Sequence, residues 1–197
     1  MSPTLISDPR ESDPLFLMLR PDRATARAIY RIAWQLRSTL GLTGKPLDED
    51  RLHISMHHLY SYGQLTPGRF DELNAVMAEL TMSCFRAGFS WSESFQHPTW
   101  RPLVLRGDET LTGVEMLHAE LDAALCRIGF ARKQKTFTPH MTLLRDPYDV
   151  GEQEIDPVSW LVRDIALVRS LRGRGQHLEL ARWPLLDRAG LASTAVH

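Results

Sequence analysis

The sequence predicts a single domain of the α+β or mixed α/β class. Three amphipathic helical patterns are interleaved with short segments typical of strands, and no long linker separates them. Two of the expected strands carry the same small pattern: a histidine, an apolar residue, a hydroxyl residue and another apolar residue. The composition, with 43% hydrophobic and 24% charged residues in a chain of 197, is ordinary for a globular protein with one sizeable core.

The first half of the chain is expected to alternate strands and helices after a flexible lead-in at 1–13. Residues 14–22, PLFLMLRPD, form an apolar run ended by a proline and predict a buried strand. Residues 23–41 have apolar side chains at helical spacing and end at a glycine. After a loop at 45–50, the alternation of RLHISMHHLY at 51–60 predicts another strand.

The next helix is expected to begin at Thr66 and Pro67, an N-cap and a first helical residue, and to end near Gly88. The tail at 187–197 is polar, so we expect the domain to span 14–186. Residues 89–97 and 100–108 are expected to form two strands, 112–130 a third amphipathic helix, and 139–146 another strand. A hairpin is expected from 160–171 and 176–185, across the turn RGRG.

Charge and composition argue against several functional classes. Twenty-three basic and 24 acidic residues leave a net charge of −1, which argues against a protein that coats nucleic acid by neutralising phosphates. The sequence has neither a spanning apolar segment nor the pattern of a signal peptide, so we expect a cytoplasmic protein with no membrane partner. Cys84 and Cys126 fall in expected helices at a spacing that fits no zinc motif, so we expect reduced, packed thiols.

The two histidine strands are the candidate functional site. Side chains alternate across a strand, so His53, Ser55 and His57 are expected on one face, opposite an apolar face that packs on the core. In the second strand His140 and Thr142 share a face in the same way. The pattern therefore occurs twice, which suggests two related halves of the fold.

This pair of motifs suits acid–base chemistry on a phosphodiester. Two imidazoles titrate near neutral pH, so one can accept a proton while the other donates one. Hydroxyls beside them can hydrogen-bond the oxygens of a phosphate and stabilise the charge that builds up there. Such chemistry requires no metal ion, cofactor or covalent intermediate.

HISM and HMTL resemble the duplicated motif of the two-histidine phosphoesterases, and FTPHMTLLRD resembles the second motif of their 2′-5′ RNA ligase-like branch. That branch includes the bacterial RNA 2′,3′-cyclic phosphodiesterases. The segments LFLMLRPD, GFSWSESF, RPLVLRG and IALVRSL with LELARWPL also occur in the order typical of the family, so the likeness spans roughly 14–186. The first motif departs from the family in having serine where threonine is frequent.

The resemblance implies a bilobal α+β fold with two pseudo-symmetric lobes, helices outside and a central cleft. It implies metal-independent hydrolysis of a 2′,3′-cyclic phosphate, on an RNA end or a nucleotide, to a 2′-phosphate. His140 would be the proton acceptor and His53 the proton donor, while Ser55 and Thr142 would bind the phosphate. The reverse reaction would be 2′-5′ RNA ligation. A monomer is expected, without a cofactor.

Several residues near the motifs allow more than one interpretation. His57 is a candidate substrate contact or a partner of a backbone group, whereas His58 is expected to point away and to be structural. Arg145 is a candidate substrate contact or a member of a salt bridge, and on strand parity it faces away from Thr142 unless the strand bends. Arg172 and Arg174 belong to a turn that either steers an RNA end or is simply exposed. The aromatic residues with both a stacking and a core interpretation are Trp91, Phe95 and Trp100.

Three other functions stay open at this point. If the segment at 51–60 were helical, His53 and His57 would face together as a metal-binding pair, although no glutamate lies between them. The substrate is alternatively a small cyclic nucleotide or a cyclic ADP-ribose phosphate. The third alternative is a non-catalytic module that binds RNA or a nucleotide.

Overall fold

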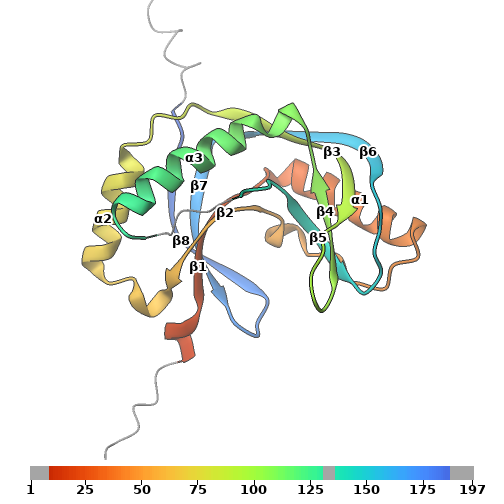
Figure 1. The fold of residues 1–197 in the computed structure, drawn as a ribbon, viewed down its shortest axis with the longest axis horizontal. Helices are drawn as coiled ribbons and strands as arrows, with labels where there is room; N and C mark the ends of the chain where they lie inside the picture. Colours follow the sequence, from red (N-terminus) through yellow and green to blue (C-terminus); the bar gives the residue numbers. More distant parts are fainter. Residues whose placement is uncertain (1–8, 131–135, 187–197) are drawn as a thin grey trace, which may run out of the picture.

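The fold belongs to the α+β class, because all pairings within its one sheet are antiparallel. The computed structural model describes residues 9–130 and 136–186. Within these residues there are three α-helices, α1 (Arg23–Thr39), α2 (Pro67–Ala78) and α3 (Thr112–Arg127) (Figure 1). The eight strands are β1 (Pro14–Leu19), β2 (Ile54–Ser61), β3 (Phe85–Ser94), β4 (Arg101–Arg106), β5 (Met141–Asp146), β6 (Gln153–Val162), β7 (Asp164–Leu171) and β8 (Gln176–Pro184).

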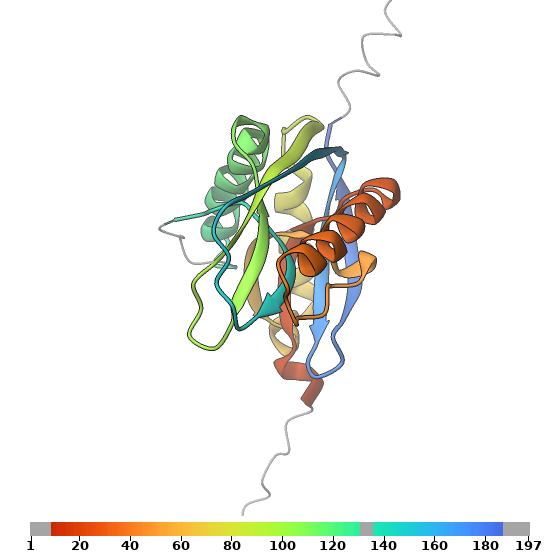
Figure 2. The ribbon, with the colours of Figure 1, turned by 90° about the vertical axis from the view of Figure 1, so that its right-hand side faces the viewer.

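The strands are ordered β6-β3-β4-β5-β2-β1-β7-β8, so β5 and β2 meet in the middle of the sheet. β2 and β5 pair in antiparallel orientation at Ile54 and Met141. Each is connected to its other neighbour through a helix: α1 joins β1 to β2, and α3 joins β4 to β5. In the side view α1 and α3 stand at opposite margins of the molecule, with strands between them (Figure 2).

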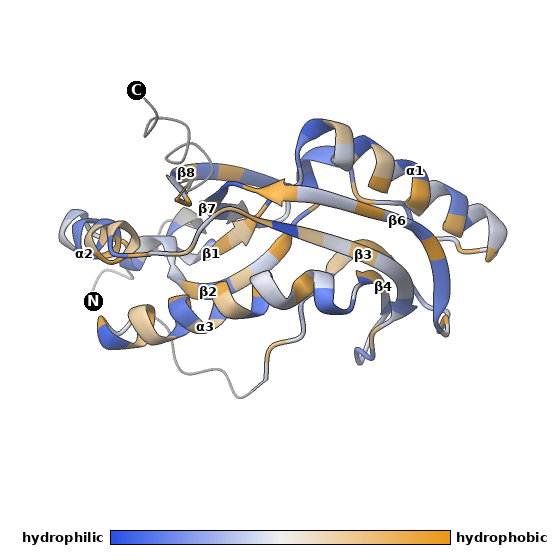
Figure 3. Cartoon of the chain, turned by 90° about the horizontal axis from the view of Figure 1, so that it is seen from above, coloured by the Kyte–Doolittle hydropathy of each residue, from blue (hydrophilic) through white to orange (hydrophobic). Residues whose placement is uncertain are grey.

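One hydrophobic core holds the sheet and the helices together. It includes Ile29 of α1, Leu73 of α2 and Leu121 of α3, packed with strand residues such as Leu17 and Ile54. Apolar and hydrophilic residues alternate along α1 and α3, as expected of amphipathic helices (Figure 3). None of the helices in the described part of the chain is long and apolar enough to cross a membrane.

The helix starts follow their capping residues. Asp22 accepts a hydrogen bond from the backbone N–H of Thr25 at 2.9 Å and caps α1. Thr66 accepts from the backbone N–H of Arg69 at 3.3 Å, and Pro67 is the first residue of α2, so the predicted start of this helix is confirmed.

Two element boundaries differ from the sequence prediction. Helix α2 ends at Ala78 rather than near Gly88, and β3 begins at Phe85, because this segment pairs along its length with β6. Cys84 therefore lies outside any helix, although both cysteines are free and half-buried as expected. The segment 160–171 is not one strand, because the chain changes neighbours at Arg163: β6 pairs with β3, and β7 pairs with β1 and β8.

Part of the expected lead-in has regular structure and contacts the domain. Pro9–Ser12 forms the 3-10 helix η1, and Asp13 is buried against Arg169, with 2.7 Å between Oδ2 and Nη2. The Oδ1 atom of Asp13 accepts a hydrogen bond from the backbone N–H of Arg172, which ties the β7–β8 turn to the start of the domain. Residues 1–8 and 187–197 lie outside the described residues.

A second short sequence repeat accompanies the two histidine motifs. LMLRPD at 17–22 covers the end of β1, and LVLRGD at 103–108 covers the end of β4, so the pattern Leu-x-Leu-Arg-x-Asp precedes both α1 and α3. The arginines of this second repeat precede the motif histidines by nearly equal distances, 33 residues (20 to 53) and 34 residues (106 to 140).

Candidate active site

Both motif strands contain a β-bulge at the same place. Against β1, Met18 pairs with Ser55 and the next residue back, Leu17, pairs with His57, so Met56 is skipped. Against β4, Val104 pairs with Thr142 and Leu103 pairs with Leu144, so Leu143 is skipped. A bulge of one residue reverses the alternation of every side chain that follows it in the strand.

The bulge in β2 exchanges the positions expected for His57 and His58. His57 is buried at 1% exposure, with its Nε2 atom 3.4 Å from Oδ1 of Asp122 on α3. His58 is exposed, and its ring lies 5.7 Å from that of Phe16, which also contacts His53. The predictions that His57 shares a face with His53 and that His58 points away are both wrong. A buried His57 side chain is not placed to contact substrate.

The bulge in β5 brings Arg145 to the same face as Thr142. Arg145 pairs with Pro102, and Thr142 pairs with Val104, two residues along β4, so all four share one side. The sequence placed Arg145 on the same face as Thr142 only if the strand bends between them, and the bulge is such a bend. Arg145 is exposed, and its guanidinium lies 5.8 Å from the ring centre of Trp100.

The two motifs meet across the middle of the sheet. In antiparallel register with Ile54 opposite Met141, His53 comes opposite Thr142, and Ser55 comes opposite His140. The apolar Ile54, Met56 and Met141 belong to the core, on the other side of the sheet. We call the side that carries His53, Ser55, His140 and Thr142 the site face.

Both histidines are held by the same backbone contact, two residues before the ring. The Nδ1 atom of His53 donates to the carbonyl of Arg51 at 2.6 Å, and that of His140 donates to the carbonyl of Thr138 at 2.8 Å. When each ring is neutral, this bond fixes the proton on Nδ1 and leaves the lone pair on Nε2. The Nε2 atom of His53 is 3.1 Å from the hydroxyl of Ser55.

The surroundings of both rings favour the neutral form. Burial lowers the pKa of His53 to about 4, and nearby positive charges including that of Arg20 act in the same direction. Burial and the charge of Arg106 lower the pKa of His140, against the opposing effect of its bond to Thr138. At neutral pH the free protein therefore holds two neutral imidazoles.

Arginines flank each motif, and the sequence interpretation did not single them out. Arg20 follows β1 and lies 3.6 Å from Glu179 on β8. Arg106 ends β4, binds Glu93 at 3.0 Å and donates to the carbonyl of Pro139 at 2.7 Å, directly before His140. The repeated Leu-x-Leu-Arg-x-Asp is the signal that would have identified both.

Aromatic rings line each motif histidine. Phe16 lies 5.6 Å from His53, and His177 of β8 meets His53 edge-on at 5.2 Å between ring centres. Phe95, which follows β3, lies 4.8 Å from His140. His177 had no pattern around it in the sequence, because β8 reaches the site only through the order of strands in the sheet.

On the core side, His57 belongs to a stack of rings that connects the two motif segments. Its ring lies 4.2 Å from that of His118 on α3, and His118 lies 3.7 Å from Phe137, three residues before His140. The metal alternative required His53 and His57 on one side of a helix. The segment is a strand that places them on opposite sides, so that alternative is rejected.

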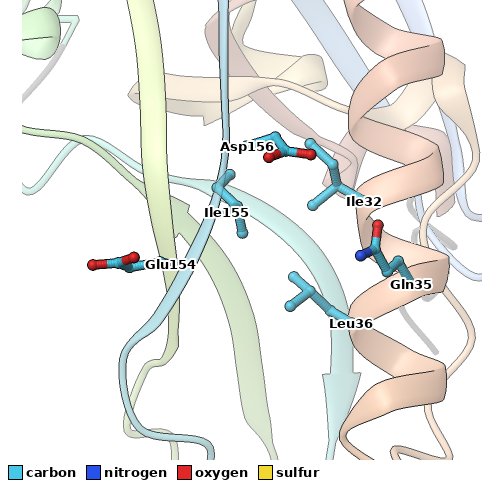
Figure 4. Close-up of a pocket in the computed structure, with 6 residues that line it drawn as sticks. All are labelled: Ile32, Gln35, Leu36, Glu154, Ile155 and Asp156. Atoms are coloured by element: carbon cyan, nitrogen blue, oxygen red, sulfur yellow. The ribbon is translucent and has the colours of Figure 1, made fainter.

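The remaining candidates lie in the β7–β8 turn and in the β3–β4 ladder. Arg172 and Arg174 occupy the β7–β8 turn, where Gly173 and Gly175 adopt positive φ. Trp91 is half-buried and pairs with Arg106 in the β3–β4 ladder. A groove between α1 and β6 is lined by residues of those two elements and not by the motifs, with Ile32, Leu36 and Ile155 among them (Figure 4).

Comparison with known proteins gives one family and a set of similar folds. Residues 21–174 match the model of the 2′-5′ RNA ligase superfamily. The structure of Escherichia coli LigT in apo form is 24% identical, with a TM-score of 0.69 over 90% of this chain and 99% of that one. No curated protein sequence matches the chain significantly.

Two further structures extend the likeness in fold. The protein TT0787 of Thermus thermophilus is 20% identical, with a TM-score of 0.70 over 89% of this chain and 99% of that one. E. coli LigT complexed with 3′-AMP is 22% identical, with a TM-score of 0.68 over 89% and 99%. At these identities the structures support the fold of this chain.

Proposed function

Since the chain belongs to the 2′-5′ RNA ligase superfamily, we propose that it is a metal-independent phosphodiesterase. Its substrate is a 2′,3′-cyclic phosphate, at the 3′ end of an RNA or on a nucleotide, and its product is a 2′-phosphate. The observation that carries the proposal is the pair of histidines fixed by equivalent backbone bonds, which leaves the Nε2 atom of each ring free of that bond on the side of the sheet that carries Ser55 and Thr142.

In the proposed reaction His140 is the base and His53 the acid. Nε2 of His140 takes a proton from water as the water oxygen bonds to phosphorus. The bond from phosphorus to O3′ breaks, and the proton on Nε2 of His53 passes to O3′. Exchange of protons with solvent restores both rings. The negative charge of a bound phosphate would raise the pKa of His53 and so favour the proton that the acid must carry.

Ser55 and Thr142 bind the phosphate in this mechanism. Each hydroxyl lies opposite the histidine of the other motif, so a phosphate between the strands would meet one donor from each half. Such donors stabilise the additional negative charge of the five-coordinate transition state. Arg145, on the same face as Thr142, would contact the substrate's other phosphates.

The repeated sequence and the repeated bulge support two pseudo-symmetric lobes with a cleft between them. In this proposal β1, α1 and β2 correspond to β4, α3 and β5, and an approximate two-fold axis passes between Ile54 and Met141. With the 5′-hydroxyl of a second RNA in place of water, the same acid and base would form a 2′-5′ linkage: O5′ loses its proton to His140 and bonds to phosphorus, while the bond to O3′ breaks and O3′ takes the proton of His53. This is the ligation for which the family is named. We propose a cytoplasmic monomer, as the sequence predicts.

A free nucleotide is a second candidate substrate. Structures of E. coli LigT with 3′-AMP, with NADP⁺ and with ATP have been described. By analogy, a small nucleotide carrying a cyclic phosphate would fit a site built around two histidines.

The test is hydrolysis of a short RNA with a 2′,3′-cyclic phosphate end, in EDTA. His53→Asn and His140→Asn are informative variants, because the asparagine amide can keep the bond to the backbone carbonyl while removing Nε2. We expect a 2′-phosphate product from the wild type and loss of turnover in both variants with unchanged melting temperature.

Other results would overturn the proposal. Activity that disappears in EDTA would indicate a metal-dependent site. Turnover that survives both substitutions would exclude the two-histidine mechanism. Binding of the RNA end without turnover, on RNA and on free cyclic nucleotides, would indicate a non-catalytic binding module.

A further inference from the structure

We propose that Trp100, stacked on His97, is a platform for the nucleobase next to the terminal nucleotide, so that the substrate is an oligonucleotide end and not a mononucleotide. This inference rests on the proposed function and names the substrate class of that site. The platform lies in the loop between β3 and β4, outside the motifs that define the family resemblance.

Trp100 presents a large ring to solvent in a fixed arrangement. Its side chain is 38% exposed, and its ring is parallel to that of His97, with 4.3 Å between centres and 10° between planes. The loop is held in turn, because the His97 carbonyl accepts from the guanidinium of Arg101, and Nδ1 of His97 accepts from the backbone N–H of Thr99 at 3.3 Å. A preordered aromatic surface loses little entropy when a base stacks on it.

The strand alternation directs this surface toward the site. Pro102 and Val104 of β4 lie on the site face beside Arg145 and Thr142. Trp100 directly precedes β4, and the guanidinium of Arg145 lies 5.8 Å from its ring centre, which places the indole on the same side. Trp100 is four residues from Val104, which corresponds to about 13 Å along an extended strand. In a nucleoside 2′,3′-cyclic phosphate the phosphate and the base are attached to one ribose. That base is too close to the phosphate to reach Trp100, whereas the base of the preceding nucleotide is suitably placed.

Arg145 supplies the charge that such a substrate needs. Its exposed guanidinium lies between Thr142 and Trp100 along the site face, 5.8 Å from the indole ring. The phosphate that links two nucleotides would lie between the cyclic phosphate and the stacked base, where this guanidinium can bind it. A cyclic mononucleotide has no such linking phosphate, so it would use neither Arg145 nor Trp100 fully.

Trp34 provides a matched control within the same chain. It is 39% exposed, and the guanidinium of Arg37 lies 5.2 Å from its ring, so its exposure and charge environment resemble those of Trp100. It lies on α1, however, which contributes no motif residue. Position relative to the histidines is therefore the main difference between the two tryptophans.

The experiment compares two substrates that end in the same 2′,3′-cyclic phosphate: adenosine 2′,3′-cyclic phosphate and the dinucleotide ApA with that end. The ratio of their kcat/KM values is measured for the wild type, Trp100→Ala, Trp100→Phe and Trp34→Ala. We expect the wild type to prefer the dinucleotide and Trp100→Ala to reduce that preference by roughly 5- to 150-fold, the range for one stacked base. Trp100→Phe should keep part of the preference, and Trp34→Ala should keep all of it.

A preference unchanged in Trp100→Ala, or no preference in the wild type, would overturn the platform while leaving the proposed function intact. Equal losses in Trp100→Ala and Trp34→Ala would also overturn it, since they indicate a general effect of removing a surface ring. The two proposals can fail separately: binding of the 2′-phosphate dinucleotide, followed by tryptophan fluorescence, tests the platform without turnover. Quenching that is lost in Trp100→Ala alone supports the platform even in a protein without hydrolase activity.

Discussion

The pH dependence of catalysis tests the proposed roles of the two histidines. The free protein must hold one imidazole neutral and the other protonated for the reaction to begin. Burial lowers the pKa of both His53 and His140, so the pH range in which this combination is most populated lies on the acid side. Changing the pH of the assay is therefore the perturbation.

The position of the optimum follows from the two pKa values. For a pair in which one group is protonated and the other is not, kcat/KM is greatest midway between the pKa values of the free enzyme. With about 4 for His53 and a value below 6.5 for His140, the optimum lies below about pH 5.3. Two unperturbed imidazoles would place it near 6.5. At pH 6.5 roughly 0.3% of His53 carries its proton, against half of an unperturbed imidazole.

The assay is initial-rate hydrolysis of a cyclic-phosphate substrate at low concentration between about pH 3 and pH 8.5, a range that extends below the pKa of about 4 for His53 and above 6.5. Arg20→Gln removes a positive charge that lowers the pKa of His53, so the alkaline limb should move to higher pH. Arg86→Gln is the control, because Arg86 is an exposed residue of β3 that hydrogen-bonds Ser159. An optimum at or above pH 6.5, or equal profiles for wild type and Arg20→Gln, would refute the reasoning.

Three further predictions concern the site and its support. Ser55→Ala and Thr142→Val should each lower kcat by about 100- to 1,000-fold with little change in melting temperature, as for the loss of one charge-stabilising donor; a loss under threefold would contradict their role. Asp146→Ala should lower the free energy of unfolding by about 3 kcal/mol in urea titrations, since the backbone N–H groups of Thr43 and Gly44 lose a buried acceptor at 2.7 and 2.6 Å; Asp149→Ala, at an exposed site, is the comparison. Burial lowers the pKa values of His53, His57 and His177 to about 4 in the folded state, so between pH 6.5 and 4 the unfolded chain binds more protons than the folded protein. The urea midpoint of unfolding should therefore decrease as the pH is lowered from 6.5 to 4. A constant midpoint would be inconsistent with neutral buried rings.

The motif pairs were predictable because their information is local. His53 with Ser55, and His140 with Thr142, share a face through alternation across three residues, before any bulge intervenes. The starts of α1 and α2 were likewise predictable from residues that act on their own first turns. Patterns that involve only three or four neighbouring residues do not depend on which strand pairs with the segment.

The errors arose where a distant partner decides the outcome. HISMHH alternates in the same way with or without a bulge, and only its pairing with Leu17 and Met18 turns His57 inward. The apolar run through Arg163 resembles one strand, because nothing local records that its two ends pair with β3 and with β1. His177 reaches His53 by the same non-local route.

The skipped residues Met56 and Leu143 make the length of each motif strand as important as its chemistry. Many apolar substitutions at Met56 would keep the strand as it is, because the residue contributes only a packed side chain. Deleting it would shift the rest of β2 by one residue, turning His57 outward and the exposed His58 into the core. At these two positions we expect the chain to tolerate substitution but not deletion. In a collection of functional variants, frame-preserving losses of one codon should therefore be absent there even where amino-acid replacements are common.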